Sequence, residues 1–171
     1  KSYNPAVGFT SRSDVIGTTP GIFWFYRGKH VPFKKIIRSV EPSLLVEFYH
    51  QASTGRLIER SYGLSPFWLM LQSGGFMGHI MTPTYQYLTE PFSPLGVKIN
   101  AGSYNYTRHA IYWGSDGSKK VSFNWNGEYG TYYNGKLNTT NFSMLVAPIP
   151  HVSITGRYNR NTFKNVGANH T

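Results

Sequence analysis

Two carboxylates, Glu47 and Glu59, have the residue types and the spacing of a catalytic pair. A hairpin would bring both to one face, and paired acidic residues flanking a glycosidic bond are the machinery of most glycoside hydrolases. Arg60 and Arg157 would nevertheless serve as ordinary partners for such carboxylates. The sequence also contains no HExxH motif, no phosphate-binding glycine loop and no nucleophile elbow. We therefore predict a protein that is not an enzyme, and a glycosidase remains as an alternative.

Other reactive residues are sparse. Histidines 50, 79, 109 and 151 occur singly, and the absence of cysteine excludes disulfides and thiolate metal sites. We therefore predict neither a metal site nor a cofactor. The formal net charge of +10 indicates an anionic partner. The densest basic cluster surrounds Pro32 and consists of Arg27, Lys29, Lys34, Lys35 and Arg38.

This basic cluster is best interpreted as a loop beside phosphate-rich headgroups. A nucleic-acid site needs basic and aromatic residues that converge on one groove, and we interpret this cluster instead as a solvated loop. We expect lipopolysaccharide and outer-membrane lipid as partners, and no nucleic acid.

Residues 120–160 alternate without a break between apolar and polar side chains. Such alternation predicts three strands with two distinct faces. The apolar face, predicted to contact lipid, contains Val121, Phe123, Trp125, Tyr129, Phe142, Met144, Val146, Val152, Ile154 and Tyr158. The polar face, predicted to line a lumen, contains Ser122, Asn124, Asn126, Glu128, Ser153, Thr155 and Arg157.

Turn residues between the strands predict how these segments pair. Asn134-Gly135 predicts a two-residue hairpin loop that places Trp125 opposite Met144. The turn at 147–151 predicts Ile154 beside Met144. Ser53-Thr54-Gly55 predicts a three-residue loop. The resulting register places Val46 opposite Tyr62, Leu44 opposite Leu64 and Val40 opposite Trp68. Glu47 and Ser61 then lie on the polar face. Ser73-Gly74-Gly75-Phe76 predicts a tight turn with Trp68 opposite Met81, Leu64 opposite Tyr85 and Tyr62 opposite Tyr87, all on the apolar face.

One hairpin fits this scheme poorly. A two-residue turn at Asp116-Gly117 would place Arg108 beside Trp125 on the apolar face. A charge near the midplane of a barrel's lipid face costs about 2–4 kcal/mol. Two solutions stay open: the turn is longer by one residue, or Arg108 reaches the interface. A shifted register would expose Ile111 and Trp113 instead.

Strand length and composition set the fold class. The strands approach the nine to eleven residues that a tilted membrane strand needs, against about five or six in soluble sheets. The 171 residues are 40% hydrophobic, 16% aromatic and 14% charged, without an apolar stretch long enough for a spanning helix. We predict an all-β protein, an antiparallel up-and-down transmembrane β-barrel of seven or eight long strands, with residues 1–171 forming a single unit. The alternative is a secreted soluble β-sandwich or barrel that binds carbohydrate through Trp24, Trp113 and Tyr132.

Several short motifs carry a family resemblance. They are Asn4-Pro5-Ala6-Val7-Gly8-Phe9 followed by Arg12, Gly102-Ser103-Tyr104-Asn105-Tyr106-Thr107-Arg108, Tyr133-Asn134-Gly135-Lys136, and Pro148-Ile149-Pro150-His151-Val152-Ser153 with Tyr158-Asn159. In this order they resemble the C-terminal β-barrel region of Bacteroidota-type outer-membrane proteins of unknown function. Those proteins carry an N-terminal module that is similar to family 9 carbohydrate-binding modules.

The resemblance implies a bacterial outer-membrane location and no catalytic residues. The N-terminal module of that family has no counterpart in this chain, and its members continue through further strands. We therefore expect a multi-strand portion of a larger barrel, whose partners are other envelope proteins or the rest of its own barrel. The opening Lys1-Ser2-Tyr3-Asn4-Pro5 lacks the apolar core of an export signal, so we expect any such signal to be absent from this form.

Overall fold

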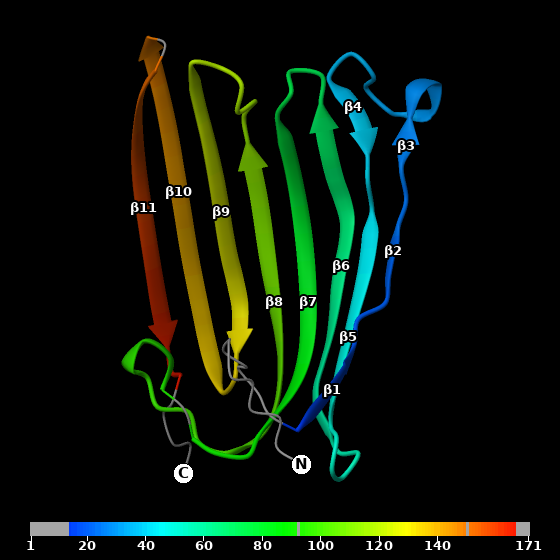
Figure 1. The fold of residues 1–171 in the computed structure, drawn as a ribbon, viewed down its shortest axis with the longest axis vertical. Helices are drawn as coiled ribbons and strands as arrows, with labels where there is room; N and C mark the ends of the chain where they lie inside the picture. The colour runs from blue at the N-terminus through cyan, green and yellow to red at the C-terminus, as the bar shows by residue number, and fades with distance from the viewer. Residues whose placement is uncertain (1–13, 92, 150, 167–171) are drawn as a thin grey trace.

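A computed structural model describes residues 14–91, 93–149 and 151–166. These residues form one antiparallel sheet of 11 strands, with the order β1-β5-β6-β7-β8-β9-β10-β11 (Figure 1). Of the short strands, β2 pairs with β5, β4 with β6, and β3 with β4. The short strands are β1 (Val15–Thr18), β2 (Gly21–Phe23), β3 (Tyr26–Arg27) and β4 (Ile37–Val40). The long strands are β5 (Ser43–Gln51), β6 (Leu57–Leu71), β7 (Phe76–Leu88), β8 (Gly102–Gly114), β9 (Val121–Tyr132), β10 (Gly135–Ile149) and β11 (Val152–Lys164).

The all-β, antiparallel, up-and-down prediction is confirmed, with seven long strands of 9 to 15 residues. Barrel closure is not part of this fold, because β1 and β11 end the pairing order without contacting each other in the described chain. Two 3-10 turns, Gly28–His30 (η1) and Pro94–Gly96 (η2), lie in connections. No helix of the described residues is long and apolar enough to cross a membrane.

The β5–β6 register agrees with the sequence prediction. Val46 pairs with Tyr62 and Leu44 with Leu64. The loop is longer than the predicted three residues, because the Gln51 N–H donates to the Arg56 carbonyl at 2.8 Å. Gly55 adopts a φ of +70°, the left-handed conformation expected for glycine in this loop. Val40 lies in the separate strand β4 and pairs with Leu69, so its predicted pairing with Trp68 is wrong by one residue.

The predicted β9–β10 and β10–β11 registers are each wrong by two residues, an even shift that leaves every side chain on its predicted face. Trp125 lies opposite Phe142 instead of Met144. The reason is that Tyr133 adopts a φ of +50°, so the β9–β10 chain turns through Tyr133 and Asn134, one residue earlier than predicted. At the β10–β11 turn His151 has a φ of +67° and Ile149 pairs with Val152, which moves Ile154 opposite Val146.

In the β6–β7 hairpin the predicted partners are also wrong. Trp68 lies opposite Gly78, Leu64 opposite Met81, and Arg60 opposite Tyr85. The pairing of Trp68 differs from the prediction by three residues, an odd number, so Trp68 lies on the polar face and its predicted place on the apolar face is wrong. The register shifts between Leu64 and Phe67, where Pro66 has no N–H to donate to a neighbouring strand. This irregularity and the turn after Leu71 together displace the pairing from the prediction.

The β8–β9 connection resolves the Arg108 conflict. The chain turns over residues 115–120, and Trp113 pairs with Trp125. Relative to the predicted two-residue turn, the pairing moves by an odd number of residues, which reverses the β8 faces. Arg108 thereby joins the polar face, while Ile111 and Trp113 join the apolar face with 37% and 49% of their surfaces exposed.

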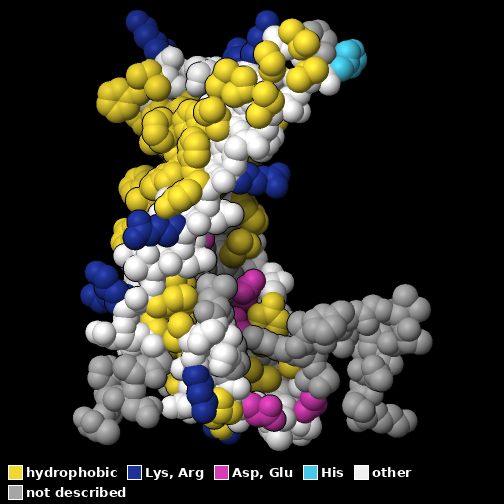
Figure 2. All heavy atoms as spheres, turned by 90° about the vertical axis from the view of Figure 1, so that its left-hand side faces the viewer, with side chains coloured by type: hydrophobic (Ala, Val, Ile, Leu, Met, Phe, Trp, Pro, Cys, Tyr) yellow, Lys and Arg dark blue, Asp and Glu magenta, His cyan; other side chains and the backbone are white. Residues whose placement is uncertain are grey.

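Burial in this sheet is the reverse of that in an ordinary globular domain. The buried polar residues all lie on one face: Ser39, Ser61, Ser65, Thr84, Gln86 and Ser122. Val31, Ile99 and Tyr133 are the buried large hydrophobic residues of the described chain, and none belongs to a strand. Viewed from the β11 edge, hydrophobic side chains gather on the surface toward the β10–β11 turn (Figure 2).

Candidate functional site

The two faces of the sheet form the candidate site. Cross-strand partners share a face, so the register fixes the side on which each strand residue lies. The ten residues predicted to contact lipid lie together on one face, here called the apolar face, and the seven predicted lumen residues lie on the other, the polar face. On the apolar face Val121, Ile154 and Tyr158 expose 56%, 63% and 52% of their surfaces.

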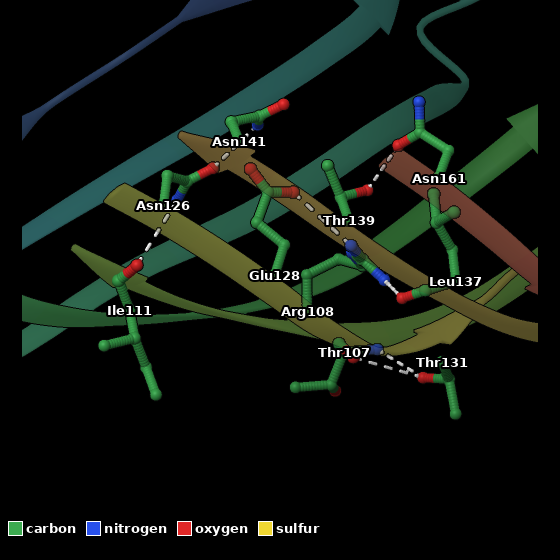
Figure 3. A network of polar contacts seen from close by, with 10 residues as sticks. All are labelled: Thr107, Arg108, Ile111, Asn126, Glu128, Thr131, Leu137, Thr139, Asn141 and Asn161. Atoms are coloured by element: carbon green, nitrogen blue, oxygen red, sulfur yellow. Dashed lines mark hydrogen bonds and ion pairs between the residues drawn. The ribbon is translucent and has the colours of Figure 1, made fainter. Parts of the chain in front are cut away.

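An ion pair lies at the centre of the polar face. Arg108 on β8 donates from Nη2 to Oε2 of Glu128 on β9 at 3.3 Å (Figure 3). Arg108 Nη1 also donates to the Leu137 carbonyl on β10, across the intervening strand. The Arg108 side chain is 13% exposed. A guanidinium with a carboxylate and a carbonyl partner satisfies its charge in a confined space.

Amide and hydroxyl groups extend this network toward β11. The Asn141 Nδ2 donates to the Asn126 Oδ1 at 3.1 Å, and the Thr139 hydroxyl donates to the Asn161 Oδ1 at 2.8 Å (Figure 3). Asn159 and Arg157 follow on β11, opposite Asn141 and Ser143. The polar face therefore presents hydrogen-bonding groups across three strands.

A second polar cluster lies near the β9–β10 turn. The hydroxyls of Tyr106 and Tyr133 both donate to Oε1 of Gln86, at 3.0 and 2.8 Å. Nε2 of Gln86 donates to Oε2 of Glu59 at 3.5 Å. Burial raises the pKa of Tyr133, which keeps its hydroxyl protonated as a donor. These contacts tie the β9–β10 turn to β7.

The carboxylates considered for catalysis lie on this same face. Glu47 accepts a hydrogen bond from the Ser61 hydroxyl at 3.0 Å, and the two residues are directly opposite each other, as predicted. Glu59 is opposite Tyr49, so Glu47 and Glu59 are diagonal neighbours. Each carboxylate is engaged by a neutral hydrogen-bond donor.

The apolar face contains a contact that the sequence did not reveal. His79 and His109 come from adjacent strands, and their Nε2 and Nδ1 atoms lie 3.2 Å apart. The His109 ring also stacks on Tyr129, with centroids 5.1 Å apart. The sequence analysis treated these histidines as isolated because it did not predict a β7–β8 register. No group of three or more His, Cys, Asp or Glu that could hold a metal occurs among the described residues.

The turns at one end of the sheet form a basic rim, defined by residues 28–36, 72–75 and 115–120 (top in Figure 1). It carries exposed lysines at 29, 34, 35, 119 and 120. Asp116 within this rim accepts hydrogen bonds from the Ser118 N–H and hydroxyl at 2.9 and 2.8 Å, which lower the pKa of its carboxyl. Gly74 packs so close that an added Cβ would lie 2.7 Å from this carboxyl group.

Protein-family models, curated proteins and solved structures give no match. The fold and its two faces therefore carry the functional argument. Of the motifs behind the family resemblance, Gly102–Arg108 lies in β8, and Tyr133–Lys136 covers the β9–β10 turn and the start of β10. Asn4–Phe9, Arg12 and Pro150 lie outside the described residues.

Proposed function

We propose that this chain forms part of the wall of a bacterial outer-membrane β-barrel, with its apolar face toward lipid and its polar face toward the lumen. The observation that carries the proposal is the reversed burial. Serine, threonine and glutamine are buried in the strands, while phenylalanine, tryptophan and isoleucine are exposed. Exposed apolar surface costs roughly 25 cal/mol per Å² in water, and a hydrocarbon environment removes that cost.

Strand length supports the same function. Strands β7, β8 and β11 each have 13 residues. At about 3.3 Å per residue such a strand is roughly 43 Å long, and a tilt near 45° reduces its span to roughly 30 Å. That span covers the apolar band of about 25 Å in an outer-membrane barrel.

The basic rim and the sheet edges indicate the partners. The rim lysines favour the phosphates of lipopolysaccharide. Asp116, the acidic residue of the rim, is already bonded to Ser118 and Lys119 within its own loop, so it does not neutralise the other lysines. The outer edges at β11 and at β1 require strand partners in lipid, where unpaired backbone groups are costly. Further strands of the same barrel, or another envelope protein, would supply them.

Within the envelope, such a wall would serve as a pore, a ligand-binding barrel or a structural subunit of a complex. The soluble carbohydrate-binding alternative requires Phe123, Phe142 and Met144 to be buried in a core. Phe142 and Met144 are 37% and 42% exposed in this single-layered sheet, which favours the membrane function over the soluble one.

Tryptophan quenching tests this proposal. The chain has four tryptophans, of which Trp113 and Trp125 lie on the apolar face and Trp68 lies on the polar face. Single-tryptophan variants, with the others changed to Phe, would be refolded into liposomes containing brominated lipid. We expect strong quenching at Trp113 and Trp125 and weak quenching at Trp68. Equal quenching at all three positions, or none at Trp113 and Trp125, would contradict the proposal.

A further inference from the structure

The polar face carries a continuous set of aromatic rings across three strands. Trp68 of β6 stacks on Phe76 of β7, with centroids 5.6 Å apart, and its ring is also 5.6 Å from that of Tyr112 on β8. The register places all three on the polar side. Trp68 also lies over Gly78, which leaves room for the indole against the backbone. Because this face is polar across β9, β10 and β11, we seek a role for these rings other than lipid contact.

A cavity of about 250 Å³ opens at one end of these rings. Trp24, Trp68, Glu41 and Ser65 are among its lining residues. Glu41 is held in place by its own N–H, which donates to the Trp68 carbonyl at 2.7 Å, and by the Ser39 hydroxyl at 2.7 Å. Ser65 is 3% exposed, and its hydroxyl has no hydrogen-bond partner among the described residues. A buried hydroxyl without a partner is rare in folded proteins.

A second cavity, of about 340 Å³, opens at the other end. Phe76 and Tyr112 form one side of it, and Asn124, Asn126 and Arg157 contribute amide and guanidinium groups. Asn124 and Arg157 are exposed. The aromatic rings therefore connect two cavities, each of which combines an apolar surface with hydrogen-bonding groups.

We propose that the rings of Trp68, Phe76 and Tyr112, with the two cavities beside them, form an extended binding site for a neutral linear oligosaccharide. A pyranose has apolar C–H faces that pack on aromatic rings and equatorial hydroxyls that both donate and accept. Glu41 accepts such hydrogen bonds, while Asn124 and Asn126 do both. A hydrocarbon chain would leave these polar groups without partners.

This inference deepens the proposed function, because it assigns a ligand class to the face that would line the lumen. The test is calorimetric titration of the refolded chain with maltohexaose, cellohexaose and chitohexaose, in a detergent whose headgroup contains no sugar. We expect saturable binding of at least one of them. Trp24→Ala and Asn124→Ala both alter exposed residues, and we expect each to weaken binding by about tenfold.

Trp113→Ala is the matched control, since it removes an exposed tryptophan from the apolar face. We expect its affinity to stay within about twofold of the unaltered chain. Circular dichroism of each variant confirms that the strands are retained. Absence of binding to all three oligosaccharides, or an equal loss in the Trp113 and Trp24 variants, would overturn the inference. The tryptophan-quenching experiment uses no sugar, so a failure of the sugar titration does not affect the test of the membrane proposal.

Discussion

Arg108 and Glu128 form an ion pair on the polar face, with Nη2 and Oε2 3.3 Å apart and the arginine side chain 13% exposed. Removing one partner leaves the other charge confined without its counterpart. We expect Arg108→Leu to lower the free energy of unfolding by about 2 kcal/mol. The measurement is denaturant unfolding in micelles, monitored by tryptophan fluorescence.

Arg157→Leu is the control for that substitution. Arg157 lies on the same face but is exposed on the edge strand β11. We expect a change within about 0.5 kcal/mol, as for most exposed positions. If the two leucine variants lost equal stability, the ion pair would have no special role in the sheet.

Gly78 and Gly156 form a second matched pair for substitution. A Cβ added at Gly78 would lie 2.3 Å from the Trp68 ring, whereas a Cβ at Gly156 would meet nothing within 4 Å. We expect Gly78→Ala to displace the indole and destabilise the fold by about 1–3 kcal/mol. Gly156→Ala should be neutral or stabilising by up to about 1 kcal/mol. Thermal unfolding compares them, and a tolerated Gly78→Ala would show that Trp68 does not pack as described.

The sequence predicted the faces more accurately than the registers. In β9, β10 and β11 the alternation grouped the residues on the same faces as the observed pairing does, because a shift of two residues leaves the side unchanged. The register depended on turn geometry that composition does not specify. Tyr133 and His151 take positive φ angles that are uncommon for such residues, and the sequence favoured Asn134-Gly135 instead.

Long-range contacts were the least predictable part of the candidate site. The His79–His109 contact and the Gln86 hydrogen bonds with Tyr106 and Tyr133 depend on the β7–β8 pairing and on the β9–β10 turn. Neither was fixed by local sequence. The unfavourable position predicted for Arg108, on the apolar face, correctly indicated that the predicted β8–β9 register was wrong.

The turn at residues 115–120 should respond to acid. Hydrogen bonds from Ser118 lower the pKa of Asp116 below the ordinary value of 3.8, so folding favours its charged form. The resulting stabilisation is fully present above pH 3.8 and is lost as the pH falls through the lower pKa of the folded state. We expect the Ser118 amide resonance to titrate in that acidic range. Asp116→Asn should abolish the titration, and an unchanged Ser118 resonance in the parent would contradict this contact.

Adjacent residues on β10 should differ sharply in their tolerance of charge. Phe142 lies on the apolar face and Ser143 on the polar face. In a bilayer we expect Phe142→Arg to destabilise the fold by about 2–4 kcal/mol if the position lies near the midplane. Ser143→Arg should cost less than about 1 kcal/mol, because it faces polar neighbours. Equilibrium unfolding in liposomes measures both, and equal effects would contradict the assignment of the faces.

The central claim is that the apolar face contacts lipid, and a nitroxide scan along 121–129 tests it most directly. Each position would carry a spin label in a bilayer, and its relaxation by lipid-soluble oxygen would be compared with that by a water-soluble nickel complex. We predict period-two oxygen accessibility, with maxima at Val121, Phe123 and Trp125 and minima at Asn124 and Asn126. Protection of the three apolar positions from both reagents, in a chain that stays monodisperse without detergent, would contradict the account.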